Sequence, residues 1–508
     1  MKLMKLTYNE ILKQVKKKGF IISLCILILF SVGLPVLYKL FAYSNTTYPI
    51  FNDSSKEYYE NQIIKNPSTS DDKLFNELIN EKLSIIDCAI NKKEQSTSFK
   101  NTLYDEYASV KLSIIVLDKL INNEKINTKN IDEWFMLNTT DYINYTKEEL
   151  IKEKQVLEKQ ALELKNTIDK SDYTWYLKRQ IQMMSDDGEN NKKIIGLLKE
   201  LIDLNITDEN DFRAKEANKI IDYYNQKEYV LTEQEYNKQN NNKKLSYEVY
   251  VKITKEKNKE IDNNILKSYY AIRNNYEYSN NAKTTLNEII ANNITVISII
   301  IVVIAGGIVA NEFQKGTIRL LVIRPSKRWK ILLSKFLAVV SLTIIFGVIT
   351  YIMSFITCSI SFGFKELLAN DLAVIGTQVV KTSYIASSIS SLFIQLIPII
   401  FIALGAFFLS TITNSTALSV GLSIFVLMGS SLAMMVLLML KFPFLDLTFL
   451  PYLNFNQFVP INKITLLDNY MMYQIYYTLP KALLVLGIWG IVLYMVSNVV
   501  FTKKDIKN

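Results

Sequence analysis

Basic side chains gather in one short stretch of the sequence, residues 310–335, which lies between two long apolar runs. The stretch reads ANEFQKGTIRLLVIRPSKRWKILLSK, and its one acidic residue is Glu312. Its basic residues are Lys315, Arg319, Arg324, Lys327, Arg328, Lys330 and Lys335. Side chains of this kind favour charge-assisted contacts with anionic lipid or with another protein, so we expect a docking surface here.

Catalytic groups are scarce in the rest of the chain. It contains no histidine, which excludes catalysis and metal binding by imidazole. It also contains no G-x-x-x-x-G-K-[ST] loop, so the sequence predicts no ATP hydrolysis by that route. We therefore expect a protein that is not an enzyme, with no catalytic residues, no metal site and no cofactor of its own.

The order of residues in the basic stretch predicts a helix end, a short helix and a corner. Gly316 is suited to the position after a helix, and Thr317 to capping a short helix at 318–323. Pro325 disfavours helix at the residue before it, and Ser326 is suited to capping the next helix.

Three bases, Lys327, Arg328 and Lys330, would lie in the first turn of that next helix. A helix dipole disfavours bases there by roughly 0.3–1 kcal/mol each, so another interaction must offset the cost. Membrane orientation and attraction to anionic lipid offer about 1 kcal/mol per base, and a cytosolic protein partner is the alternative.

Apolar runs elsewhere predict six membrane-spanning helices, because roughly 20 apolar residues cross the hydrocarbon. Residues outside 44–290 hold 22 of the 58 Lys and Arg and 7 of the 49 Asp and Glu, so the remaining 36 and 42 lie inside that window. This separation is typical of a membrane protein with a translocated domain. The expected spans are 20–43, 289–310, 331–362, 385–409, 417–440 and 482–501.

The charges outside the spans predict the topology. Lysines before the first span and after the last place both termini in the cytoplasm, and residues 44–288 outside the cell. Residues 3–18 have the pattern of an interfacial helix, with Leu3, Leu6, Ile11, Leu12 and Val15 on one face. Residues 441–478, rich in aromatic residues and proline, suit an outer interfacial belt or a partial re-entrant hairpin.

The predicted fold is therefore an all-α membrane protein of three parts. Residues 1–43 form the interfacial helix and the first span, and residues 44–288 form an α-helical extracellular domain. Residues 289–508 form spans two to six, with a cytoplasmic helix at about 315–330. Within the middle part, Thr146 with Glu149 and Thr232 with Glu235 have the spacing of helix capping boxes.

A family resemblance rests on the basic stretch. Its residues resemble, in order and spacing, the signature that follows the second span of type-2 ABC exporter permeases. The matching residues are Glu312, Gly316-Thr317, Leu320-Leu321, Pro325, Arg328 and Lys335. The six-span layout extends the resemblance more loosely to everything outside residues 44–290.

This resemblance implies an ATP-driven exporter in which the chain is the membrane permease subunit. The family's loop after span two docks on a separate ABC ATPase subunit, which binds ATP and Mg and hydrolyses ATP. The permeases work as dimers, which implies a homodimer or a heterodimer with a similar permease. The residues expected to couple the chain to the ATPase are Glu312, Gly316, Thr317, Ile318, Arg319, Leu320, Leu321, Pro325 and Arg328.

A translocation route between the two membrane halves follows from the same resemblance. Small or polar residues within the spans are its candidates: Gly306, Gly307, Gln395 and Ser423. The alternative explanation of such residues is close packing and hydrogen bonding between helices. The substrate is not readable from the spans, and an antimicrobial peptide or drug exported by a Gram-positive bacterium is one hypothesis. The alternative function is a membrane-anchored extracellular sensor or binding protein without transport activity.

Overall fold

The computed structural model describes residues 2–42, 51–92, 98–185, 188–239, 247–278, 281–318, 327–440, 442, 444–453, 455, 465–466 and 476–503. These residues are almost all helical, which confirms the predicted all-α membrane protein. The chain divides into two compact units. Unit 1 holds Met1–Phe41, Gln226–Lys267 and Glu277–Asn508, and unit 2 holds Ala42–Asn225 and Ser268–Tyr276. The predicted middle domain is thus shared between the two units.

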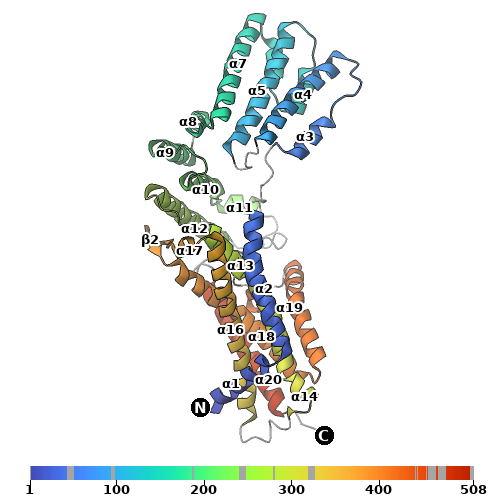
Figure 1. Cartoon of the computed structure of the whole chain (residues 1–508), viewed down its shortest axis with the longest axis vertical. Coiled ribbons are helices and arrows are strands. Elements are labelled where there is room, and N and C mark those ends of the chain that lie inside the picture. Colours follow the sequence, from blue (N-terminus) through green and yellow to red (C-terminus); the bar gives the residue numbers. More distant parts are fainter. Residues whose placement is uncertain are drawn as a thin grey trace. The chain divides into compact units, whose positions relative to one another are not determined.

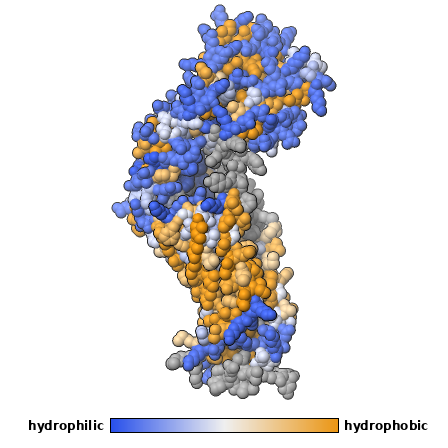
Figure 2. All heavy atoms as spheres, viewed as in Figure 1, coloured by the Kyte–Doolittle hydropathy of each residue, from blue (hydrophilic) through white to orange (hydrophobic). Residues whose placement is uncertain are grey.

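Six helices of unit 1 are long and apolar enough to cross a membrane, within the part of the chain that is described. They are α2 (Lys18–Ala42), α13 (Asn281–Ile308), α16 (Arg328–Phe362), α18 (Tyr384–Ile412), α19 (Thr416–Met439) and α20 (Leu479–Lys503). Each overlaps one predicted span, and together they form one bundle (Figure 1) whose visible face is apolar (Figure 2). The predicted span starts at Ile289, later than α13 itself, because the first turns of α13 are polar. Hydropathy marks only the part of a helix that is suited to lipid.

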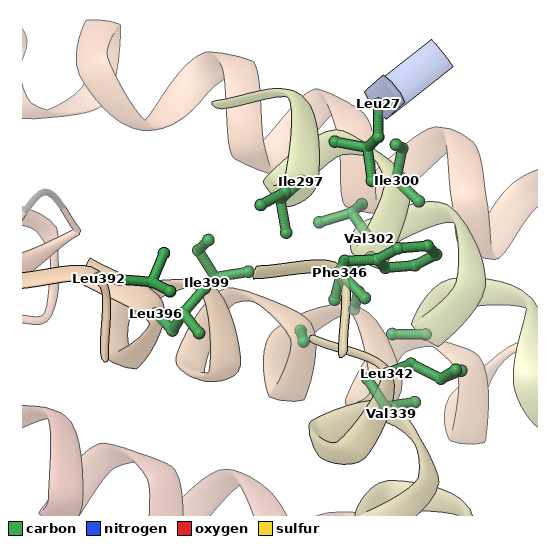
Figure 3. Close-up of a cluster of buried hydrophobic side chains, with 14 of the residues drawn as sticks. Leu27, Ile297, Ile300, Val302, Val339, Leu342, Phe346, Leu392, Leu396 and Ile399 are labelled. Carbon is green, nitrogen blue, oxygen red and sulfur yellow. The ribbon is translucent and has the colours of Figure 1, made fainter. Parts of the chain in front are cut away.

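The core of the bundle lies among α13, α16 and α18. Side chains from these helices, together with Leu27 of α2, pack into one buried cluster (Figure 3). Phe346 of α16 and Leu396 of α18 are almost fully buried there. Few residues of α2, α19 and α20 are buried, as expected for helices that face lipid.

The N-terminal helix α1 (Lys2–Val15) packs against α16. Its buried side chains are polar, Glu10 and Gln14, while Leu12 and Val15 are exposed. The predicted single apolar face is therefore wrong in part. Leu3, Leu6 and Ile11 are half-buried, while Leu12 and Val15 lie on an outward stripe with Met4 and Tyr8. The physical reason is that α1 places carboxyl and amide groups against a polar site in the bundle.

Two connections of the bundle contain structure that hydropathy does not reveal. Residues after α16 form α17 (Phe364–Leu368) and an antiparallel hairpin of β1 (Asp371–Ile375) and β2 (Gln378–Thr382). Between α19 and α20, the short helices η2 (Leu445–Leu447) and η3 (Leu450–Tyr452) precede paired β3 (Thr465–Leu466) and β4 (Tyr476–Tyr477).

The segment that contains η2 and η3 reaches toward the middle of the bundle. The Phe449 ring lies 5.4 Å from that of Phe401 on α18 and 5.7 Å from that of Trp489 on α20. Phe401 lies 17 residues after the start of α18, so it is about 25 Å along the helix from that end of the bundle. Of the two alternatives for 441–478, the described residues favour the re-entrant one.

Unit 2 is built from helices whose caps follow the sequence. Its elements are α3 (Asp53–Glu60), α4 (Ser70–Asn91), α5 (Phe99–Ile121), α6 (Thr128–Phe135), η1 (Thr139–Asn144), α7 (Lys147–Lys170), α8 (Tyr173–Met183), α9 (Glu189–Asp203) and α10 (Phe212–Gln226). The predicted capping box at Thr146 and Glu149 starts α7. In unit 1, α11 (Glu233–Gln239) likewise follows the reciprocal bonds of Thr232 and Glu235, and the next helix, α12 (Tyr247–Arg273), has residues in both units.

Gly306 on α13 allows α19 to approach closely. A Cβ atom built on Gly306 would lie 3.3 Å from the Cα of Val420 and 3.3 Å from the Ser423 Oγ. We predict that Gly306→Leu lowers the unfolding free energy by about 1–3 kcal/mol, because backbone atoms cannot move aside cheaply. Thermal unfolding of the purified protein in detergent measures the loss. Gly421→Leu, at an exposed α19 position with open space, is the matched control; equal melting temperatures for both variants would contradict the prediction.

Candidate coupling site

A buried ion cluster lies at the end of the bundle where α1, the start of α16 and α14 (Ala310–Gln314) meet. Lys335 on α16 is fully buried, and its Nζ lies 2.8 Å from the Glu312 Oε1 and 2.9 Å from the Glu10 Oε2. Lys13 on α1 pairs with the same Glu312 oxygen and remains half exposed. We call Glu10, Lys13, Glu312 and Lys335 the base cluster, and this end of the bundle the base.

The base cluster balances two cations with two carboxylates. Balance matters because an isolated buried ion costs several kcal/mol, while an opposite charge with good geometry offsets that cost. The second oxygen of Glu312, Oε2, has no hydrogen-bond partner in the described part of the chain. Beside the cluster, burial and then repulsion from Lys13 and Lys335 lower the pKa of Lys17. The surroundings therefore disfavour further positive charge.

The chain turns sharply just after Glu312. Lys315 ends α14, and Gly316 has the left-handed φ of 67° that favours glycine, as expected from the sequence. The Thr317 hydroxyl donates a long hydrogen bond, 3.5 Å, to the carbonyl of Glu312, and the Ile318 side chain is buried in the bundle core. The predicted coupling residues Arg319, Leu320, Leu321 and Pro325 lie outside the described residues.

The start of α16 corrects one expectation and adds one contact. The residue that precedes the helix is Lys327, not Ser326, and it makes no side-chain capping bond. Arg328 donates a 3.0 Å hydrogen bond from Nη1 to the carbonyl of Thr502, near the end of α20. A cation is favourable at the C-terminal end of a helix, so α20 supplies part of the offset that these bases require.

The base is also joined to the turn between α18 and α19. The chain breaks from α13 into α14 at Val309, and the Ser410 Oγ accepts hydrogen bonds from the backbone N–H groups of Val309 and Ala310 at 3.1 and 3.0 Å. The Gln314 Oε1 accepts the backbone N–H of Thr416 at 3.2 Å. Polar side chains thus satisfy the N–H groups that a helix break and a helix start leave free.

The predicted route residues do not all come together. Gly306 and Ser423 meet in the packing of α13 on α19, and Gly307 lies near Thr416. Gln395 on α18 is buried; its Nε2 donates to the Ser391 Oγ, and its Oε1 has no partner among the described residues. The hydrogen bond between Val309 and Ser410 places these two residues at the same level of the bundle. Measured along the helices from that level, Gln395 on α18 lies about 18 Å further away than Gly306 on α13. Their role in transport stays a prediction.

Two members of the base cluster, Glu10 and Lys13, were not among the predicted site residues, and Lys335 was named in the basic stretch and the family resemblance but not among the expected coupling residues. One signal in the sequence could have identified Glu10. It is the only acidic residue among residues 1–43, and it lies within a run of lysines. A lone carboxylate on a basic helix that lies against a membrane indicates a specific partner.

We predict that Lys335→Met lowers the unfolding free energy by about 3–5 kcal/mol, because it leaves two buried carboxylates without their shared cation. Denaturant unfolding in detergent micelles measures the change. The double variant Lys335→Met with Glu312→Gln should recover part of the loss, since fewer unpaired charges remain. The matched control is Lys330→Met, on a half-buried lysine of the same helix. Equal losses for Lys335→Met and the control would contradict the prediction.

Two curated relatives from Bacillus subtilis (strain 168) resemble the chain. One is "Uncharacterized protein YhcI", 30% identical over 217 residues, which are 41% of this chain and 64% of the relative. The other is "Uncharacterized membrane protein YdbK", 40% identical over 82 residues, which are 15% of this chain and 33% of the relative. The matches thus span less than two thirds of either relative's length. No solved structure matches the chain.

A family model described as "Protein of unknown function (DUF2705)" matches residues 252–507. The matched residues include α13 to α20, and with them Glu312 and Lys335 of the base cluster. Because this match covers half of the sequence, the chain belongs to the DUF2705 family, and its six apolar helices make it a multi-pass membrane protein.

Proposed function

We propose that the protein is the membrane permease subunit of an ABC-type exporter, driven by a separate ATPase subunit that binds ATP and Mg. The base cluster carries this proposal, because it joins α1, α14 and α16 at the two ends of the basic stretch 310–335 through ion pairs centred on the fully buried Lys335. An anchor that only holds unit 2 at the membrane has no need for such a costly arrangement at one end of the bundle.

The contacts of the base suggest how a push from the ATPase would spread. Force applied at residues 318–323 would act on α14 and α16 together, since Glu312 and Lys335 share an ion pair. The bonds from Ser410 and Gln314 would carry it to the turn between α18 and α19. Movement of these helices as connected bodies is the kind of change that opens a route on one side and closes it on the other. A second permease copy, identical or similar, would supply the other half of the route.

The proposed orientation places the base and both termini in the cytoplasm and unit 2 outside. Lysines are concentrated on α1 and around the start of α16, as the positive-inside rule requires for a cytoplasmic base. The substrate class of the proposal is an antimicrobial peptide or drug removed from the membrane of a Gram-positive cell.

We predict that the protein, solubilised in mild detergent, co-purifies with an ABC ATPase subunit, and that Arg319→Ala with Leu321→Ala reduces the recovered ATPase at least tenfold. The physical reason is that a short docking helix depends on a few central side chains. Quantitative mass spectrometry of the purified complex provides the readout. Phe364→Ala with Ile375→Ala, which changes exposed side chains after α16, is the control and should retain the ATPase. Undiminished ATPase recovery with the Arg319 and Leu321 variant would refute the docking role.

Native cysteines offer a test of the orientation. Cys88 in unit 2 is exposed, Cys358 is buried in the bundle, and Cys25 lies on a predicted lipid-facing span. We predict that a membrane-impermeant maleimide labels Cys88 in intact cells, because unit 2 faces outward. Cys88→Ser should abolish the labelling. Permeabilised cells are the positive control, because in them the reagent reaches both sides of the membrane. Labelling of Cys88 only after permeabilisation would place unit 2 in the cytoplasm.

A further inference from the structure

A corner of unit 2 displays apolar side chains to solvent. α6 ends at Phe135, and the next residue, Met136, has a φ of 53°, in the left-handed region that side chains other than glycine rarely adopt. The Met136 side chain is 91% exposed, and Ile143 of η1 is 57% exposed. Trp134 and Tyr145 are 43% and 42% exposed. We call residues 132–149 the acidic apolar corner.

Asp132 fixes the shape of this corner. Its Oδ1 accepts the backbone N–H and the hydroxyl of Thr139 at 2.8 and 2.5 Å, and its Oδ2 accepts the same two groups of Thr140 at 2.7 and 2.5 Å. Burial opposes ionisation of this carboxyl, but the four hydrogen bonds together hold its pKa below the usual range. The bonds tie η1 to α6, so the exposed side chains are held in place and do not collapse onto the domain.

The corner rests on the core of unit 2. The Trp134 ring packs edge-on against Phe75 of α4 at 5.3 Å, and Phe135 and Leu137 are buried beside it. These large apolar side chains stay in water beside the core, so the domain is less stable than if they were buried. Figure 2 shows apolar areas on the otherwise polar surface of unit 2. Rigid aromatic side chains and adaptable methionine are typical of surfaces that bind a partner.

The charges around the corner select the partner. Residues 128–149 contain five acids and two bases, Lys129 and Lys147. Glu133, Asp141 and Glu148 are exposed, and among the described residues none of the three forms an ion pair. An anionic lipid surface would be repelled here, and so would a second copy of the same corner. A partner with apolar and positively charged groups side by side would be attracted to both features.

We propose that the acidic apolar corner of unit 2 is a docking site for a cationic amphipathic peptide. The apolar face of the peptide would cover Trp134, Met136 and Ile143, and its lysines or arginines would pair with Glu133, Asp141 and Glu148. This inference goes beyond the proposed export function, and its readout does not depend on an ATPase.

The test uses the full-length protein in nanodiscs of zwitterionic lipid and a dye-labelled synthetic helix of lysine and leucine. Fluorescence anisotropy, with empty nanodiscs subtracted, gives the dissociation constant. Trp134→Ser with Ile143→Ser should weaken binding at least tenfold, and so should Glu133→Lys with Asp141→Lys. Binding to the wild-type protein should fall with added salt, as expected for contacts between exposed charges.

Matched controls distinguish the corner from general adhesion of the peptide. Leu162→Ser, at a 61% exposed position on α7 of the same unit, should leave the dissociation constant unchanged. A peptide with glutamate in place of lysine should bind at least tenfold more weakly. The proposal is overturned if both corner variants, folded as judged by unchanged melting temperature, bind like the wild type. Equal binding of the glutamate peptide also overturns it. Retained ATPase co-purification with a peptide-binding loss separates this site from the export proposal.

Discussion

The ammonium group of Lys335, buried between Glu10 and Glu312, constrains the arrangement of the whole base. A charge without contact with water requires partners that stay in place, and its two carboxylate partners come from two other parts of the chain. The ion pairs therefore position α1 on α16 and hold the end of α14 against both. The polar inner face of α1, which is unusual for an interfacial helix, follows from this requirement.

The rest of the base is built around that fixed point. The helix break at Val309 leaves two backbone N–H groups that donate hydrogen bonds to Ser410, and the left-handed Gly316 turns the chain just after α14. Arg328 connects the start of α16 to the end of α20. Three spans, α16, α18 and α19, thus meet residues 309–314 through directional polar bonds. Further along the bundle, apolar packing dominates, and close approaches such as Gly306 against Val420 set the distances between helices.

The sequence predicted the features that depend on local composition. Six spans follow from hydropathy, the turn at Gly316 from the conformational freedom of glycine, and the start of α7 from the reciprocal bonds of Thr146 and Glu149. The partners of Lys335 could not be predicted, because they lie 325 and 23 residues away in the sequence and meet only in the tertiary structure. The hairpin at 371–382 and the re-entrant segment near Phe449 were missed or left open for a related reason. Short polar or aromatic segments take their structure from the helices that surround them.

The proposed coupling role requires that an ABC ATPase contacts the base of the bundle in the cell. A photoreactive amino acid at Trp329, which is 41% exposed at the start of α16, would capture a neighbour directly upon illumination of intact membranes. The same amino acid at Phe364, exposed at the opposite end of α16, provides the comparison. We expect position 329, and not position 364, to yield an adduct that mass spectrometry identifies as an ABC ATPase. Adducts with lipid alone at position 329, or the same protein adducts at both positions, would contradict the account.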